Sequence, residues 1–219
     1  MTKNRSDCIK LIAIITMLID HTGAILFPDL TLLRVIGRVA FPLFAFQLGI
    51  GYSHTKSFAK YVTRIFVFGA AVQLLYAASI SLFAIDGSPL DFNIFFTLTL
   101  GLLSIRLFDA GKYIHLIPVF AIPLMAGYYG VNLDYGVYGI AMILILFMTK
   151  DHPLRLTAAF LALNLAYSLL THNLLQSACV IALAFILRPP ELKIPIPGCV
   201  FYLFYPVHLA ALHAISKLP

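Results

Sequence analysis

Nine apolar stretches follow one another along this 219-residue chain, with only short loops between them. A helix needs roughly 20 mostly apolar residues to cross a lipid bilayer, and shorter spans can thin it or lie inside a bundle. The stretches cover Ile9–Phe27, Leu32–Tyr52, Tyr61–Phe83, Phe92–Leu107, Ile114–Tyr129, Tyr135–Met148, Leu154–Leu170, Leu174–Leu187 and Pro197–Ile215. We therefore predict an all-α fold, a polytopic transmembrane helix bundle of about nine spans (range about eight to ten).

Composition supports lipid as the solvent. Hydrophobic residues make up 61% of the chain and charged residues 11%, whereas a soluble domain is about half apolar and a quarter charged. A soluble chain of this length could not bury so much apolar surface. The length suits one compact bundle, so we predict a single integral-membrane domain over residues 1–219.

The basic residues predict the orientation of the bundle. Cytoplasmic loops of membrane proteins carry an excess of Lys and Arg. With the N-terminus in the cytoplasm, every Lys and Arg except Arg34, Arg38 and Lys217 falls on an inner segment. The net charge of +6 therefore indicates membrane topology, and we expect no nucleic-acid partner. The first stretch lacks a small-x-small cleavage site and reads as a signal-anchor helix.

Ionisable residues in the first two stretches are the strongest functional signal. An aspartate in hydrocarbon costs roughly 2.5–3.5 kcal/mol, so Asp20 and the adjacent His21 must face the bundle interior or a water-filled cavity. Histidine is suited to move protons near neutral pH. Arg34 and Arg38 are four residues apart and share one helix face. The alternatives are a polar pair that fixes helix packing, and arginines that snorkel or pair with Asp20 or Asp29.

Further candidates lie later in the chain. The last stretch contains Tyr205 and His208 around Pro206, and the fourth begins near Asn93. We expect Asn93, Tyr205 and His208 to bind substrate; the alternatives are a helix cap for Asn93 and a packing role for His208. No set of His, Asp and Cys residues has metal-ligand spacing, so we expect no metal.

Five motifs together resemble those of the TraX family. They run in order over nearly the whole chain: Asp20-His21, Arg34-Val35-Ile36-Gly37-Arg38-Val39-Ala40-Phe41-Pro42-Leu43-Phe44-Ala45-Phe46, Asn93-Ile94-Phe95-Phe96-Thr97-Leu98, Tyr135-Gly136-Val137-Tyr138-Gly139 and Phe204-Tyr205-Pro206-Val207-His208-Leu209. The family is named for the membrane protein that N-acetylates the F-type conjugative pilin subunit. The chain is also similar to the broader transmembrane acyltransferases, including the heparan glucosaminide acetyltransferase type.

The resemblance implies a membrane-embedded acyltransferase of a bacterial inner or plasma membrane. Its acyl donor would be acetyl-CoA from the cytosol, and its acceptor an amine or hydroxyl at the outer face, on a peptide N-terminus or a glycan. His21 would be the general base or a transient acyl carrier, Asp20 would orient or charge it, and Arg38 would steady an anion or the thioester oxygen. Arg34, Asn93, Tyr205 and His208 would line the substrate site.

Two other classes of function stay open on the sequence. In a small proton-coupled transporter or flippase, Asp20 and His21 would form a proton relay. In a structural membrane subunit, both residues would tolerate substitution. Labelling with radioactive acetyl-CoA in isolated membranes distinguishes the three.

Overall fold

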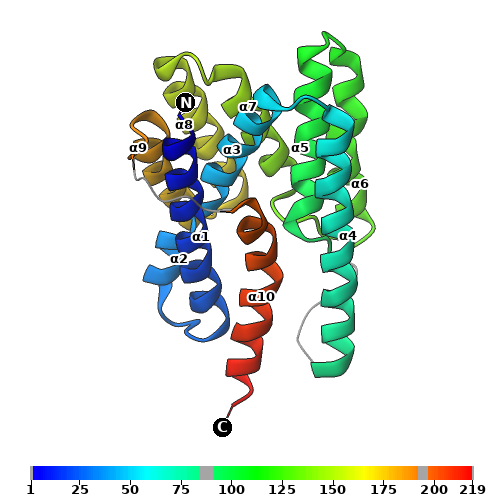
Figure 1. The fold of residues 1–219 in the computed structure, drawn as a ribbon, viewed down its shortest axis with the longest axis vertical. Coiled ribbons are helices and arrows are strands. Elements are labelled where there is room, and N and C mark those ends of the chain that lie inside the picture. The colour runs from blue at the N-terminus through cyan, green and yellow to red at the C-terminus, as the bar shows by residue number, and fades with distance from the viewer. Residues whose placement is uncertain (1, 84–90, 192–196, 219) are drawn as a thin grey trace. The chain divides into compact units, whose positions relative to one another are not determined.

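The computed structural model describes residues 2–83, 91–191 and 197–218, which form helices joined by short loops (Figure 1). Within these ranges the backbone makes no β-strand beyond an isolated bridge between Phe92 and Leu133. The helices are α1 Lys3–Ile25, α2 Thr31–Gly37, α3 Ala40–His54, α4 Phe58–Phe83, α5 Ile94–Asp109, η1 Tyr113–His115, α6 Leu116–Tyr128, α7 Gly136–Thr149, α8 Pro153–Thr171, η2 Leu175–Ile181, α9 Ala182–Leu187 and α10 Gly198–Ser216. The predicted all-α fold is confirmed.

The nine apolar stretches each coincide with one helix or with two consecutive helices. Among the described residues, four helical segments are long and apolar enough to cross a membrane: Lys3–Ile25, Thr31–His54, Phe58–Ala77 and Pro153–Thr171. Tyr113–Tyr128, Gly136–Thr149 and Leu175–Leu187 are apolar but shorter. Nine spans and a cytoplasmic N-terminus stay predictions.

The second apolar stretch, expected as one helix, is divided at Arg38 and Val39 into α2 and α3. Pro42 lies in the first turn of α3 and has no N–H to donate to the carbonyl of Arg38, and its ring would crowd that carbonyl in a continuous helix. The division places Arg38 at the C-terminus of α2, where its backbone N–H bonds to the carbonyls of Arg34 and Ile36.

The chain divides into two compact units, and the single integral-membrane domain over residues 1–219 stays a prediction. One contains Met1–Gln47 and Asp151–Pro219, and the other Leu48–Lys150. In the first unit α1 packs against α2 and α10, while η2 packs against α2, α8 and α9. Ile9, Leu43 and Phe160 are fully buried in its core. In the second unit α5 packs against α4, α6 and α7.

Two glycines set the close approach of α1 and α2 inside the first unit. A Cβ atom added to Gly37 would lie 2.2 Å from both Cβ and Oδ1 of Asp20, and one added to Gly23 would lie 2.7 Å from Cβ of Leu33. Real Cβ atoms essentially never come so close. The absence of side chains at Gly23 and Gly37 therefore lets the polar end of α1 lie directly against α2.

Candidate functional site

The candidate site begins at two neighbouring residues of α1 that point in different directions. Successive residues on a helix project about 100° apart, because 3.6 residues make a turn. Asp20 is buried and faces α2, whereas His21 is half-buried and faces α10. No hydrogen bond joins these two described side chains, so the ring takes its orientation from another residue.

Asp20 is held by both arginines of α2. Nη2 of Arg38 donates to Oδ1 and to Oδ2 of Asp20, each over 2.6 Å. Nη1 of Arg34 donates to Oδ2 over 2.8 Å and to the backbone carbonyl of Asp20 over 3.0 Å. Two guanidinium groups around one carboxylate leave a net charge of +1, so this cluster can still attract an anion.

His21 is joined to the distant end of the chain. Its Nδ1 lies 2.6 Å from Nε2 of His208 on α10. The ring centroids are 4.9 Å apart and the ring planes differ by only 12°. A centroid distance of 4.9 Å with a nitrogen–nitrogen distance of 2.6 Å means that both nitrogens lie close to the line between the two centroids. The rings therefore meet edge to edge in nearly one plane, as an in-plane N–H···N hydrogen bond requires.

The hydrogen bonds around His208 assign the protons of both rings. Nδ1 of His208 lies 2.6 Å from the backbone carbonyl oxygen of Phe204, which can only accept, so this Nδ1 carries a hydrogen. In neutral His208 the other nitrogen, Nε2, then has a lone pair and accepts from Nδ1–H of His21. Nε2 of His21 is therefore left with a lone pair, which is the form that a general base needs.

Tyr205 borders both imidazoles from the preceding turn of α10. Its ring lies edge-on to His21, with centroids 6.1 Å apart, and edge-on to His208, with centroids 5.9 Å apart. Such T-shaped contacts are favourable arrangements of aromatic rings and restrict ring rotation. Tyr205 thus narrows the space around the His21–His208 pair.

The structure brings together six of the seven residues expected at the site, from three helices of one unit: Asp20, His21, Arg34, Arg38, Tyr205 and His208. Asn93 belongs to the other unit. It caps α5 by accepting from the backbone N–H of Phe95, and its amide donates to the carbonyl of Gly69 and to Oε1 of Gln73.

Gln176 is a site residue that the sequence did not single out. It is 4% exposed, and its Oε1 lies 3.4 Å from Nη1 of Arg38, at the outer limit of a hydrogen bond. A lone glutamine in the apolar stretch Leu174–Leu187 was the available signal. In the described parts of the chain no three His, Cys, Asp or Glu side chains are placed to hold a metal ion.

The chain has apolar helices of membrane-spanning length, and they carry a cluster of ion-paired and imidazole side chains. These features define the class as a helical membrane protein with a buried polar site. Residues 5–216 match the family described as TraX protein. The chain therefore belongs to the TraX family, as the motifs indicated.

Two relatives extend the comparison. Over 93% of this chain and 92% of the relative, the sequence is 31% identical to a Dichelobacter nodosus protein named "Probable fimbrial assembly protein FimC, serogroup H1". A second similarity, 41% identity over 71 residues, is to the uncharacterized protein RP591 of Rickettsia prowazekii (strain Madrid E), and covers 32% of this chain and 27% of that one. No solved structure matches the chain.

Proposed function

We propose that this protein is a membrane-embedded acetyltransferase that moves an acetyl group from cytosolic acetyl-CoA to an amine or hydroxyl at the outer face of a bacterial inner membrane. The observation that carries the proposal is the ordered series of hydrogen bonds from the Phe204 carbonyl through His208 to His21. It leaves a basic nitrogen on a half-buried imidazole, next in sequence to an ion cluster with a net charge of +1.

The chemistry follows from these groups. Nε2 of His21 takes a proton from the acceptor amine or hydroxyl while the acceptor attacks the thioester carbonyl carbon. The new N–C or O–C bond forms and the C–S bond breaks, and the departing thiolate recovers the proton from His21. The positive charge of Arg38, together with that of Arg34, stabilises the negative charge that develops on the carbonyl oxygen. Asp20 fixes both guanidinium groups, and His208 fixes the tautomer of His21.

The acceptor class is inferred from the relatives of this chain. The D. nodosus relative is named as a fimbrial assembly protein, and membership of the TraX family agrees with a pilin-type substrate. We therefore place a peptide N-terminal amine first and a glycan hydroxyl second. Both carry an exchangeable hydrogen that a neutral imidazole can remove.

A proton-coupled transporter or flippase is the second candidate, and one observation favours it. Two imidazoles in direct hydrogen bond can pass a proton from one ring to the other, and ionisable groups inside membranes often form such relays. Proton uptake coupled to solute movement in reconstituted vesicles, with no acetyl transfer, would support this alternative.

The deciding experiment follows acetyl transfer from radiolabelled acetyl-CoA to peptide and glycan acceptors by the purified, membrane-reconstituted protein. His21→Ala should lower the rate by about 100- to 10,000-fold, because general-base catalysis contributes that much. His213→Gln is the matched control: it lies on α10 and bonds through Nδ1 to the carbonyl of Leu209 over 2.8 Å, as His208 does to that of Phe204. Full transfer by a folded His21→Ala protein would refute the assignment.

His208 requires a different test because we assign it a positioning role. His208→Ala removes one hydrogen bond worth about 1 kcal/mol, so kcat should fall about fivefold with little change in KM. His208→Gln should restore part of the rate, since an amide oxygen can accept from Nδ1–H of His21. A readout independent of rate is the nitrogen-15 NMR signature of the His21 tautomer, which should become mixed in His208→Ala. An unchanged tautomer in that variant would contradict the positioning role.

A further inference from the structure

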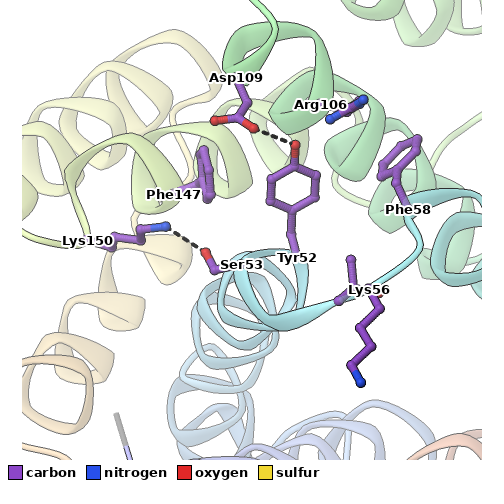
Figure 2. Close-up of a pocket in the computed structure, with 9 residues that line it drawn as sticks. Tyr52, Ser53, Lys56, Phe58, Arg106, Asp109, Phe147 and Lys150 are labelled. Carbon is purple, nitrogen blue, oxygen red and sulfur yellow. Dashed lines mark hydrogen bonds between the residues drawn. The ribbon is translucent and has the colours of Figure 1, made fainter.

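A second polar site lies wholly within the unit Leu48–Lys150, at the end where three of its helices stop. A cavity of about 430 Å³ opens there between the end of α3, the loop into α4, and the ends of α5 and α7. Its lining combines aromatic, hydroxyl and charged side chains, most of which appear in Figure 2: Tyr52, Ser53, Thr55, Lys56, Phe58, Arg106, Asp109, Phe147 and Lys150. Ligand pockets in proteins typically enclose about 300–1,000 Å³.

The charge of this pocket is positive. Lys56, Arg106 and Lys150 line the pocket together with one carboxylate, that of Asp109, which leaves a net charge of +2. Oδ2 of Asp109 accepts from the hydroxyl of Tyr52 over 2.8 Å, and no described carboxylate forms an ion pair with any of the three cations. The pocket's one acid therefore offsets only part of the positive charge.

Neutral groups contact two of the three cations, Lys150 and Arg106. Nζ of Lys150 donates to Oγ of Ser53 over 2.7 Å and lies 4.1 Å from the ring centroid of Phe147. The guanidinium carbon of Arg106 lies 5.7 Å from the ring centroid of Phe58. Figure 2 shows Lys150 and Arg106 on opposite sides of Tyr52, with the ammonium of Lys56 pointing away from them. Aromatic faces attract a cation without neutralising it, so the charge stays available to a ligand.

Two hydroxyl groups position the charged side chains of the pocket. Tyr52 and Ser53 lie in the last turn of α3: the Tyr52 hydroxyl donates to Asp109, and the Ser53 hydroxyl donates to the carbonyl of Gly49 over 3.2 Å while it accepts from Lys150. Tyr52 is in turn fixed by edge-on contacts with Phe58 and Phe147, at 6.0 Å and 5.4 Å between centroids. Arg106 and Lys150, both at this cavity, are the donor types that bind a phosphate group.

Membrane topology alone would account for positive residues at one end of a bundle. It would not require an arginine of α5 and the lysine that follows α7 to line one cavity together with two hydroxyl groups of α3. We propose that this pocket binds a phosphate-bearing ligand. The phosphate can come from a soluble nucleotide-type molecule such as coenzyme A or from an anionic lipid headgroup. The proposal is independent of the acetyltransferase proposal, because no residue of the His21 cluster lines the pocket.

Binding measured without turnover tests this proposal. The full chain is placed in nanodiscs of phosphatidylcholine, and the Kd for coenzyme A is measured by calorimetry. A second set of nanodiscs also contains phosphatidylglycerol, and native mass spectrometry counts the phosphatidylglycerol molecules bound to the protein. Arg106→Gln and Lys150→Gln should each weaken binding about tenfold, because each removes a charge-assisted contact. Lys60→Gln and Lys112→Gln are the controls, being exposed cations outside the pocket.

The two probes separate the sources of the phosphate. Loss of coenzyme A binding in both pocket variants, with Lys60→Gln and Lys112→Gln unaffected, supports a soluble ligand; the same pattern for phosphatidylglycerol supports a headgroup. Equal binding of both probes by pocket and control variants overturns the proposal. Unchanged far-UV circular dichroism of the two pocket variants, which lie on different helices, excludes misfolding as the cause. His21→Ala should bind both probes normally, so failure of the acetyltransferase proposal leaves this result intact.

Discussion

Replacement of Asp20 by asparagine is the sharpest test of the ion cluster between α1 and α2. The Asp20 side chain is 10% exposed and accepts bonds of 2.6 and 2.6 Å from Arg38 and of 2.8 Å from Arg34. Breaking a buried ion pair by removing one partner costs about 3–5 kcal/mol, because the remaining charge is uncompensated. Asparagine keeps one acceptor oxygen, so we expect a loss of about 3 kcal/mol in the free energy of unfolding.

The two arginines should not share that loss equally. Arg38 is 13% exposed and donates to both carboxylate oxygens, whereas Arg34 is 28% exposed and donates to one. A double-mutant cycle of Asp20→Asn with Arg38→Gln should therefore give a coupling of about 2 kcal/mol. The cycle with Arg34→Gln should give about 1 kcal/mol, since water screens the more exposed charge.

Unfolding by sodium dodecyl sulfate in mixed micelles measures these free energies. Far-UV circular dichroism is the signal, since the chain has no tryptophan. Asp29→Asn is the matched control, because Asp29 is exposed and forms no ion pair with a described residue. A coupling below about 0.5 kcal/mol between Asp20 and Arg38 would refute the buried-pair reasoning.

Two further predictions concern packing around the site. Gly37→Ala should destabilise the protein by about 1–3 kcal/mol and reduce acetyl transfer, because the added Cβ would collide with Asp20. Gly127→Ala has nothing within 4 Å of the added Cβ and should be neutral or stabilising in the same sodium dodecyl sulfate unfolding assay. Asn93→Ala should lower the free energy of unfolding by about 1 kcal/mol, because it removes the cap of α5, and should leave acetyl transfer unchanged. A loss of transfer without a loss of stability would instead give Asn93 a role in substrate binding.

The part of the candidate site formed by α1 and α2, which are neighbours in sequence, could be predicted from the sequence. The four-residue spacing of Arg34 and Arg38 placed both guanidinium groups on one helix face, and a pairing with Asp20 was among the alternatives. The structure shows that pairing. The same helical repeat explains why the neighbouring side chains of Asp20 and His21 project in different directions. Such features depend on the 3.6-residue repeat within one helix and on one short connection between helices.

The other half could not be predicted, because it depends on tertiary packing. His208 lies 187 residues from His21, and its contact with that ring depends on the packing of α10 on α1. The resemblance implied that Asp20 orients or charges the ring of His21, and the structure adds a hydrogen bond between that ring and His208. The interruption between α2 and α3 was also missed, although Pro42 was its visible cause. The position of Asn93 in the other unit follows from contacts that no sequence spacing reports.

Two different residues bind the arginines and orient the ring of His21: Asp20 binds Arg34 and Arg38, and His208 contacts His21. Asp20 is committed to the arginines by three short bonds, so its negative charge offsets theirs and does not raise the basicity of His21 directly. The orientation of His21 comes instead from a neutral partner on α10 that is itself fixed by a backbone carbonyl. A neutral partner adds no negative charge that would oppose an incoming acyl oxygen. The site therefore combines a neutral imidazole with a cationic cluster, and the proposed acyl transfer would use the first as base and the second to favour the negative charge on the acyl oxygen.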